Sequence, residues 1–160
     1  MYEGLIVRIS GFMRKIHLIV IHCSATRADK ELTAFDLDTM HRRRGFNGIG
    51  YHFYIRKNGD IKTTRPIERI GAHVKGFNRT SIGICYEGGL DCHGRPADTR
   101  TEWQVHSMHV LVLTLLRDYP GCRVCGHRDL SPDLNGNGEI EPEEWVKACP
   151  CFDAEEEWAS

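Results

Sequence analysis

The chain lacks a long apolar run: no stretch approaches the roughly 20 residues that a membrane-spanning helix needs. It also lacks an excess of either charge, because 21 lysines and arginines stand against 22 aspartates and glutamates, for a net charge of -1. A near-neutral chain gives no electrostatic reason to expect nucleic acid or an anionic membrane as the main partner. Internal repeats, low-complexity stretches and linkers are also missing, so 160 residues predict one domain.

The N-terminus lacks the basic-then-apolar pattern that is typical of a secretory signal peptide. The seven cysteines are an odd number, which argues against a full disulfide framework and for a reducing compartment at synthesis. We expect residues 1–15 to form a peripheral N-terminal extension, with Met1 or Met13 as the natural start. The domain is then expected to cover residues 16–160.

Strand-like and helix-like segments alternate along this domain. The expected strands cover residues 16–22, 51–56, 60–64, 81–86 and 122–125. Asn58-Gly59 predicts a hairpin turn between the second and third of them. This order predicts the α/β class, as a single three-layer domain with a central mixed β-sheet flanked by helices.

Two helices are expected, from Thr33 to a stop at Gly45 and from about Thr101 to Tyr119. The apolar positions of the first helix are Phe35, Leu37 and Met40. The second helix is apolar over much of its circumference, so we expect it to pack deeply.

Histidine and cysteine carry the strongest chemical signal. His22 closes an apolar run, His127 follows another one, and Cys149 and Cys151 lie near the C-terminus. Two imidazoles and one thiolate form a three-ligand zinc set with an open fourth position, which is typical of hydrolases. From the residues alone, a satisfied core or surface histidine is a more common role than a ligand. Cys151 also competes with Cys149 as the thiolate.

Several short segments carry a family resemblance. They are residues 20–26, 50–53, 71–78, 81–85, 126–127 and 147–150, and together they span most of the chain. In this order they resemble the zinc-dependent N-acetylmuramoyl-L-alanine amidases of the phage-lysozyme type, whose fold peptidoglycan recognition proteins share. The resemblance implies a zinc ion held by His22, His127 and Cys149. It also implies hydrolysis of the amide between N-acetylmuramic acid and L-alanine in peptidoglycan.

The same resemblance implies two catalytic side chains, Tyr51 and Lys147, at the positions of the family's tyrosine and lysine. A lysine ammonium suits developing negative charge, and a tyrosine hydroxyl can hold water or exchange a proton. Without the resemblance, a surface cation and a half-buried aromatic would be the favoured interpretations. His73 and Asn78 lie in a polar loop that, by resemblance, flanks the substrate groove, although such loops are usually polar for other reasons.

The cytoplasmic recycling amidases of the wider superfamily differ at two places. They carry a glutamate base in the strand that matches residues 81–85, and an aspartate as the third ligand. This chain has Cys85 and Cys149 there, so it resembles the lysozyme type. Glu87 stays an outside candidate for the base, because the strand period of two places it on the face of Cys85.

Residues 133–144 match the twelve-position pattern of a calcium loop, as an insertion relative to the simplest amidase pattern. The oxygen ligands at positions one, three, five and twelve are Asp133, Asn135, Asn137 and Glu144. We therefore predict a structural Ca²⁺ site. The alternative is a polar turn that caps a helix beginning near Glu141, since the preceding residues do not look like an incoming helix.

Two other interpretations stay open. A non-catalytic peptidoglycan-binding module would share the fold, although such relatives typically lack the cysteine ligand. A structural-zinc or nucleic-acid protein would instead use four thiolates, from Cys122, Cys125, Cys149 and Cys151.

The amidase interpretation sets the expected partners and place of action. We expect peptidoglycan or muropeptides as the partner, a monomer, and no binding of nucleic acid or membrane. We expect synthesis in the cytoplasm and action on the cell wall after release, as for a phage or prophage product, or after dedicated export. A cytoplasmic recycling role is the alternative.

Overall fold

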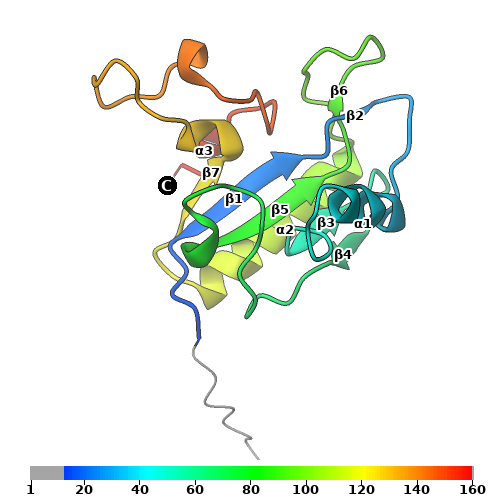
Figure 1. Ribbon diagram of the computed structural model, residues 1–160, viewed down its shortest axis with the longest axis horizontal. Helices are drawn as coiled ribbons and strands as arrows, with labels where there is room; N and C mark the ends of the chain where they lie inside the picture. The colour runs from blue at the N-terminus through cyan, green and yellow to red at the C-terminus, as the bar shows by residue number, and fades with distance from the viewer. Residues whose placement is uncertain (1–12, 160) are drawn as a thin grey trace, which may run out of the picture.

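The computed structural model describes residues 13–159, which build a five-stranded sheet in the order β4-β3-β5-β1-β7 (Figure 1). Its strands are β1 (Leu18–Cys23), β3 (Phe53–Ile55), β4 (Ile61–Thr63), β5 (Ser81–Tyr86) and β7 (Arg123–Gly126). β1 lies between β5 and β7 and runs parallel to both, β3 is parallel to β5, and β4 is antiparallel to β3. A short parallel pair, β2 (Thr26–Arg27) and β6 (Gly89–Leu90), stands apart from this sheet.

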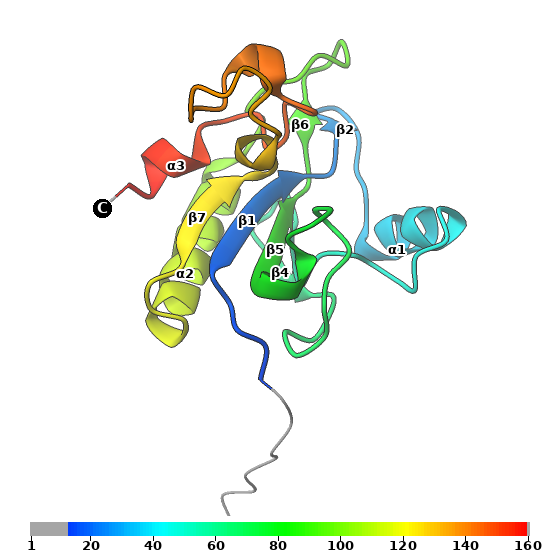
Figure 2. The ribbon, with the colours of Figure 1, turned by 60° about the vertical axis from the view of Figure 1, so that its left-hand side comes forward.

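Two helices cover opposite faces of the sheet (Figure 2). On one face, α2 (Glu102–Asp118) places Met108 and Val112 in the main core with alternate residues of β1 and β5. On the other face, α1 (Ala34–Arg43) packs Leu37 against Tyr54 and Cys85. The predicted three-layer α/β domain is thereby confirmed. A short helix, α3 (Ala154–Glu157), packs beside β7.

Both long helices begin where the sequence predicts. Thr33 caps α1 by accepting a hydrogen bond from the backbone N–H of Asp36, and Thr101 caps α2 by accepting one from Gln104. In each case the side chain of the third helical residue bonds back to the cap, forming a capping box. Each cap stabilises its helix by about 1 kcal/mol.

The expected depth of helix packing is corrected by the structure. Trp103, Val110 and Leu113 of α2 face solvent, and Trp103 is 68% exposed. On α1, Phe35 is 79% exposed and Met40 is also exposed. The reason is geometric: a helix lying on a sheet buries one stripe, so apolar residues elsewhere on its circumference stay outside.

β1 sends alternate side chains to the two faces. Ile19 and Ile21 enter the α2 core, whereas Val20 and His22 point to the opposite face. His22 therefore lies at the carboxyl end of a central parallel strand, where open α/β sheets place their ligands. β3 is shorter than the predicted strand 51–56, so Tyr51 lies just before it.

Arg14, which falls within the expected extension of residues 1–15, is hydrogen-bonded to the domain. The Arg14 guanidinium donates hydrogen bonds to the carbonyl oxygens of Ile67, Asn78 and Ser81. The rest of that expectation, including Met1, concerns residues 1–12, which lie outside the described residues. No helix within residues 13–159 has the length and apolar character needed to cross a membrane.

Candidate active site

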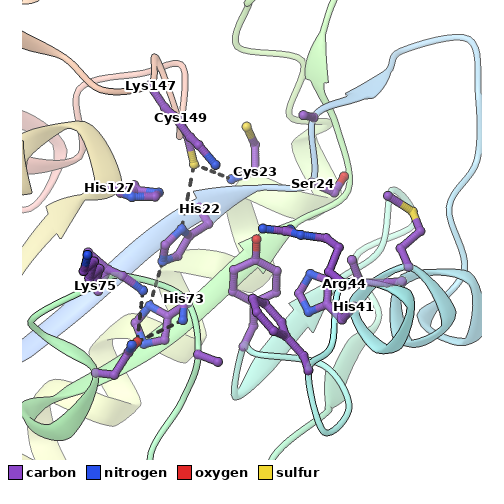
Figure 3. Close-up of a pocket in the computed structure, with 18 of the residues that line it drawn as sticks. His22, Cys23, Ser24, His41, Arg44, His73, Lys75, His127, Lys147 and Cys149 are labelled. Carbon is purple, nitrogen blue, oxygen red and sulfur yellow. Dashed lines mark hydrogen bonds between the residues drawn. The ribbon is translucent and has the colours of Figure 1, made fainter.

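Three side chains from distant parts of the chain meet at the carboxyl ends of β1 and β7. Ile21 pairs with Gly126, so the next residues, His22 and His127, lie side by side with ring centroids 4.9 Å apart. Cys149 completes the group from a C-terminal loop (Figure 3). One ligand atom from each of the three lies within 4.8 Å of the others. The predicted ligand set therefore converges in space.

The donor chemistry of this group fits zinc. The Sγ of Cys149 lies 3.9 Å from Nδ1 of His22. A tetrahedral zinc with ordinary Zn–N and Zn–S bonds separates such a pair by about 3.6 Å. Burial, followed by the neighbouring His73 and His127, holds the pKa of His22 well below its usual range. Burial and Lys147 lower the pKa of His127. Both imidazoles are therefore neutral near pH 7, as metal ligands must be.

Cys149 is held in place by several contacts. Its Sγ accepts a hydrogen bond from the backbone N–H of Cys23 over 3.2 Å, and its carbonyl accepts one from Arg128. The next carbonyl, of Pro150, accepts a hydrogen bond of 2.6 Å from the buried hydroxyl of Tyr86. The rival thiol of Cys151 points elsewhere, toward the Gly89 carbonyl at 3.3 Å.

The ring of His22 has a second partner. Its Nε2 lies 2.8 Å from Nδ1 of His73, and Nε2 of His73 lies 3.1 Å from the hydroxyl of Ser81. Asn78 fixes the loop that carries His73, because its Oδ1 accepts hydrogen bonds from the backbone N–H groups of His73 and Val74. His73 and Asn78, predicted as substrate contacts, thus both line the site with polar atoms engaged inside the protein.

A cavity of about 740 Å³ opens over the three residues. Tyr51, from the segment before β3, lines it with its ring centroid 5.0 Å from that of His22. Burial, with the thiols of Cys85 and Cys149 nearby, raises the pKa of Tyr51 well above its usual value, so the phenol stays protonated. Lys147 lines the same cavity and is exposed to solvent. All the residues predicted for zinc binding and catalysis therefore surround one space.

The α1 side of the cavity was missed by the sequence analysis. His41, Arg44 and Phe46 line it. The ring of His41 is buried, and its Nδ1 accepts a hydrogen bond from the N–H of Gly50. The sequence feature that could have indicated this wall is the spacing of His41 and Arg44, because residues at i and i+3 share a helix face.

Glu87 does not line this cavity. Its buried carboxylate pairs with Arg56 at 2.7 Å and accepts backbone N–H bonds from Leu32 and Lys57. Burial raises the pKa of Glu87, but the Arg56 guanidinium and these N–H groups outweigh it and leave the pKa lowered. Glu87 therefore forms a structural ion pair with Arg56. The expectation that it could act as the general base is wrong.

The predicted calcium loop is bounded by two single 3-10 turns, η2 (His127–Leu130) and η3 (Pro142–Glu144), instead of helices. Asp133 accepts hydrogen bonds from the N–H groups of Gly136 and Gly138, and Glu144 accepts them from Leu134 and Asn135. The helix expected near Glu141 as the alternative is thus one 3-10 turn. Calcium binding here stays a prediction.

The four-thiolate interpretation is wrong for the described residues. Within residues 13–159, His22, His127 and Cys149 form the one group of three or more histidine, cysteine or acidic side chains close enough to share a metal ion. Cys125 is buried beside Val20 and Val74, and Cys122 donates to the carbonyl of Ile16. Cys122 and Cys125 are therefore packed or hydrogen-bonded within the fold and do not form a metal site with Cys149 and Cys151.

Comparison with known proteins also points to an amidase. Residues 12–150 match the family model described as N-acetylmuramoyl-L-alanine amidase. The endolysin of Klebsiella phage KP32 is 34% identical over 140 residues, which cover 88% of this chain and 83% of the endolysin. The solved N-acetylmuramoyl-L-alanine amidase LysC from Clostridium intestinale URNW is 28% identical, with a TM-score of 0.67 over 90% of this chain and 82% of LysC.

A third relative shares the fold. A mutant of Drosophila PGRP-LB, solved in complex with tracheal cytotoxin, is 24% identical, with a TM-score of 0.68 over 93% of this chain and 83% of that protein. The match to the family model covers most of the chain, and the endolysin match supports the same activity. The chain therefore belongs to the N-acetylmuramoyl-L-alanine amidase family and is a peptidoglycan amidase.

Proposed function

We propose that this amidase uses zinc, held by His22, His127 and Cys149, to hydrolyse the amide between N-acetylmuramic acid and L-alanine. The observation that carries the proposal is the convergence of these three side chains at the floor of a cavity that Tyr51 and Lys147 also line. The family is zinc-dependent in general, and the donor set of two nitrogens and one sulfur suits zinc better than magnesium or calcium.

When bound, zinc would supply Lewis-acid chemistry, which activates water and polarises a carbonyl. The chain's own residues would do the rest. Lys147 would present its ammonium to the negative charge that develops on the amide oxygen. Tyr51, protonated at neutral pH, would donate a hydrogen bond that orients water or the carbonyl. His22, His127 and Cys149 would hold the metal close to the amide carbonyl on which Lys147 and Tyr51 act.

The substrate would lie in the open cavity, with one end near the loop of His73 and the other along α1. The structure of PGRP-LB with tracheal cytotoxin supports a muropeptide as the ligand class for this fold. We propose action on the cell wall, in keeping with the phage endolysin relatives, by a monomer without affinity for nucleic acid or membrane. Light scattering and sedimentation with DNA or vesicles would check these expectations.

Mass spectrometry of purified muropeptides tests the reaction. The protein loaded with zinc should release a peptide with a free L-alanine N-terminus and leave intact N-acetylmuramic acid. The chelator-treated protein should not, and adding zinc back should restore the release. Intact muropeptides in the presence of stoichiometric zinc would contradict the proposal and favour a binding module.

We further propose that residues 133–144 bind a structural Ca²⁺ ion that stiffens the connection between His127 and Lys147. The support is the match of the loop to the calcium pattern. Binding would raise the melting temperature on addition of millimolar calcium, as expected for an ion that binds the folded state. Asp133→Ala should remove the rise, and an unchanged wild-type melting temperature would contradict the idea.

A further inference from the structure

We infer that His73 is a positioning residue for the metal site. Its imidazole holds the His22 ring in the orientation that points Nδ1 toward Cys149, and it keeps the His22 proton on Nε2. Gly71 and Gly83 keep the space for its ring. The inference rests on the proposed zinc function and extends it from the ligands to their support.

The two nitrogens of His22 face different surroundings. Nδ1 lies 3.9 Å from Sγ of Cys149, whereas Nε2 lies 2.8 Å from Nδ1 of His73 (Figure 3). A nitrogen that binds a metal carries no proton. The proton of a neutral His22 must then lie on Nε2, from which it is donated to His73.

The proton on His22 dictates the tautomer of His73. Because Nδ1 of His73 accepts, its own proton must lie on Nε2, which donates to the hydroxyl of Ser81 over 3.1 Å. Ser81 is fully buried at the start of β5, opposite Leu18 of β1. The two strands that define the sheet centre thus also anchor the hydrogen-bond chain that ends on His22.

A glycine slot sets the position of the His73 ring. A Cβ added at Gly83 would lie 2.8 Å from Cγ and Cδ2 of His73, and one at Gly71 would lie 2.7 Å from Cδ2. Real Cβ atoms essentially never approach other atoms this closely. Neither glycine has the positive φ that would require glycine for its backbone conformation. Space for the His73 imidazole is therefore the physical reason for glycine at position 83. At position 71 the same ring is the nearest neighbour, and His52 and the Gly50 carbonyl oxygen also crowd the site at 2.9 and 3.0 Å.

This arrangement separates positioning from substrate contact. Both ring nitrogens of His73 are engaged, one by His22 and one by Ser81, so the ring has no free polar atom for a ligand. Outer partners of this kind fix the orientation of a ligating histidine, and their loss typically weakens metal affinity by about 10- to 100-fold.

Zinc affinity, measured by competition with a chromophoric chelator, tests the inference. His73→Leu keeps the bulk of the ring but no acceptor, and should weaken zinc binding by about 10- to 100-fold. His73→Asn places Oδ1 near the position of Nδ1 and should stay within about threefold of the wild type, because an acceptor for His22 is retained. Ser81→Ala and Gly83→Ala should fall between these two.

His52→Asn is the matched control. His52 is buried, and its Nδ1 accepts from the N–H of Gly83, yet it makes no hydrogen bond to His22. This variant should lose stability without losing zinc affinity. A second readout is the ¹⁵N spectrum of the zinc-loaded protein, in which His22 should carry its proton on Nε2 in the wild type and in His73→Asn.

The outcomes are distinguishable. A wild type that binds no zinc overturns the proposed function and this inference with it. A wild type that binds zinc, together with a folded His73→Leu of equal affinity, overturns the inference alone. If His73→Leu does not fold, Ser81→Ala decides: weakened zinc binding supports the positioning role, and unchanged binding overturns it.

Discussion

The backbone N–H of Cys23 donates a hydrogen bond to Sγ of Cys149 over 3.2 Å, across a separation of 126 residues. The donor follows His22 directly, so the strand that carries the first proposed ligand also holds the last one. The hydrogen bond holds this sulfur close to the imidazoles of His22 and His127. The site is thus built on the end of β1.

Replacing Lys147 by alanine should lower kcat by about 10²- to 10³-fold, because a donor to the developing oxyanion is lost. Zinc should stay stoichiometric, since Lys147 is not among the three proposed metal ligands. Zinc content and muropeptide turnover, measured on the same sample, check both halves. Lys62→Ala, at an exposed lysine outside the cavity, is the control. Wild-type turnover in Lys147→Ala would remove the lysine from the mechanism.

Tyr51→Phe deletes one hydroxyl and should lower kcat by about 10²-fold or more, while zinc binding and the melting temperature persist. Tyr54→Phe is a matched control, because its hydroxyl donates to the Leu32 carbonyl away from the cavity. That variant should lose about 1 kcal/mol of stability and keep its turnover. The reverse pattern would show that the catalytic hydroxyl is not that of Tyr51.

Substitutions of Cys149 and Cys151 should have different effects on zinc binding. Cys149→Ala should abolish stoichiometric zinc binding, because two imidazoles alone make an incomplete site. Cys151→Ser should retain zinc, because its Sγ faces the Gly89 carbonyl and the Cys23 thiol. Metal analysis after gel filtration gives the answer. Loss of zinc in Cys151→Ser with retention in Cys149→Ala would exchange their roles.

The Glu87–Arg56 ion pair should contribute to stability in a pH-dependent way. Because the folded-state pKa of Glu87 lies below the ordinary glutamate pKa of 4.5, the contribution is present above that pH. It is lost as the pH falls through the folded pKa. Glu87→Gln should therefore lower the free energy of unfolding by about 1–3 kcal/mol at pH 7.

Urea unfolding at several pH values measures this effect. The difference between wild type and Glu87→Gln should shrink in acid, where the wild-type carboxyl is also neutral. The exposed Glu143 supplies the control, since Glu143→Gln should change little at any pH. A difference that stays constant down to about pH 3, below the usual carboxyl range, would show that the charge of Glu87 is not what stabilises the fold.

Local patterns predicted the elements well. The alternation along β1 and the threonine caps of α1 and α2 are encoded within a few residues, so they can be read without the fold. The identity of the proposed zinc ligands came from the resemblance, since nine histidines offer many combinations. The errors fell where burial depends on neighbours, as at Trp103 and Phe35.

The contacts that hold the site residues in place could not be predicted from local patterns. Glu87 shares a strand face with Cys85, but its partner Arg56 arrives from the end of another strand and turns a candidate base into an ion pair. The role of Gly83 is equally invisible in sequence, because the ring that needs its space comes from the loop before β5.

The sequence by itself determined the order of strands and helices, the chemistry of the candidate ligands and the family, because these depend on residue type and local spacing. Only the tertiary structure decided that His73 supports His22 and that Arg44 joins the cavity. It also places Sγ of Cys149 beside His22, as the resemblance implied. The physical reason is that parallel strands bring their carboxyl ends together irrespective of chain distance. Contacts across that edge are then set by register and loop anchoring, which no local pattern records.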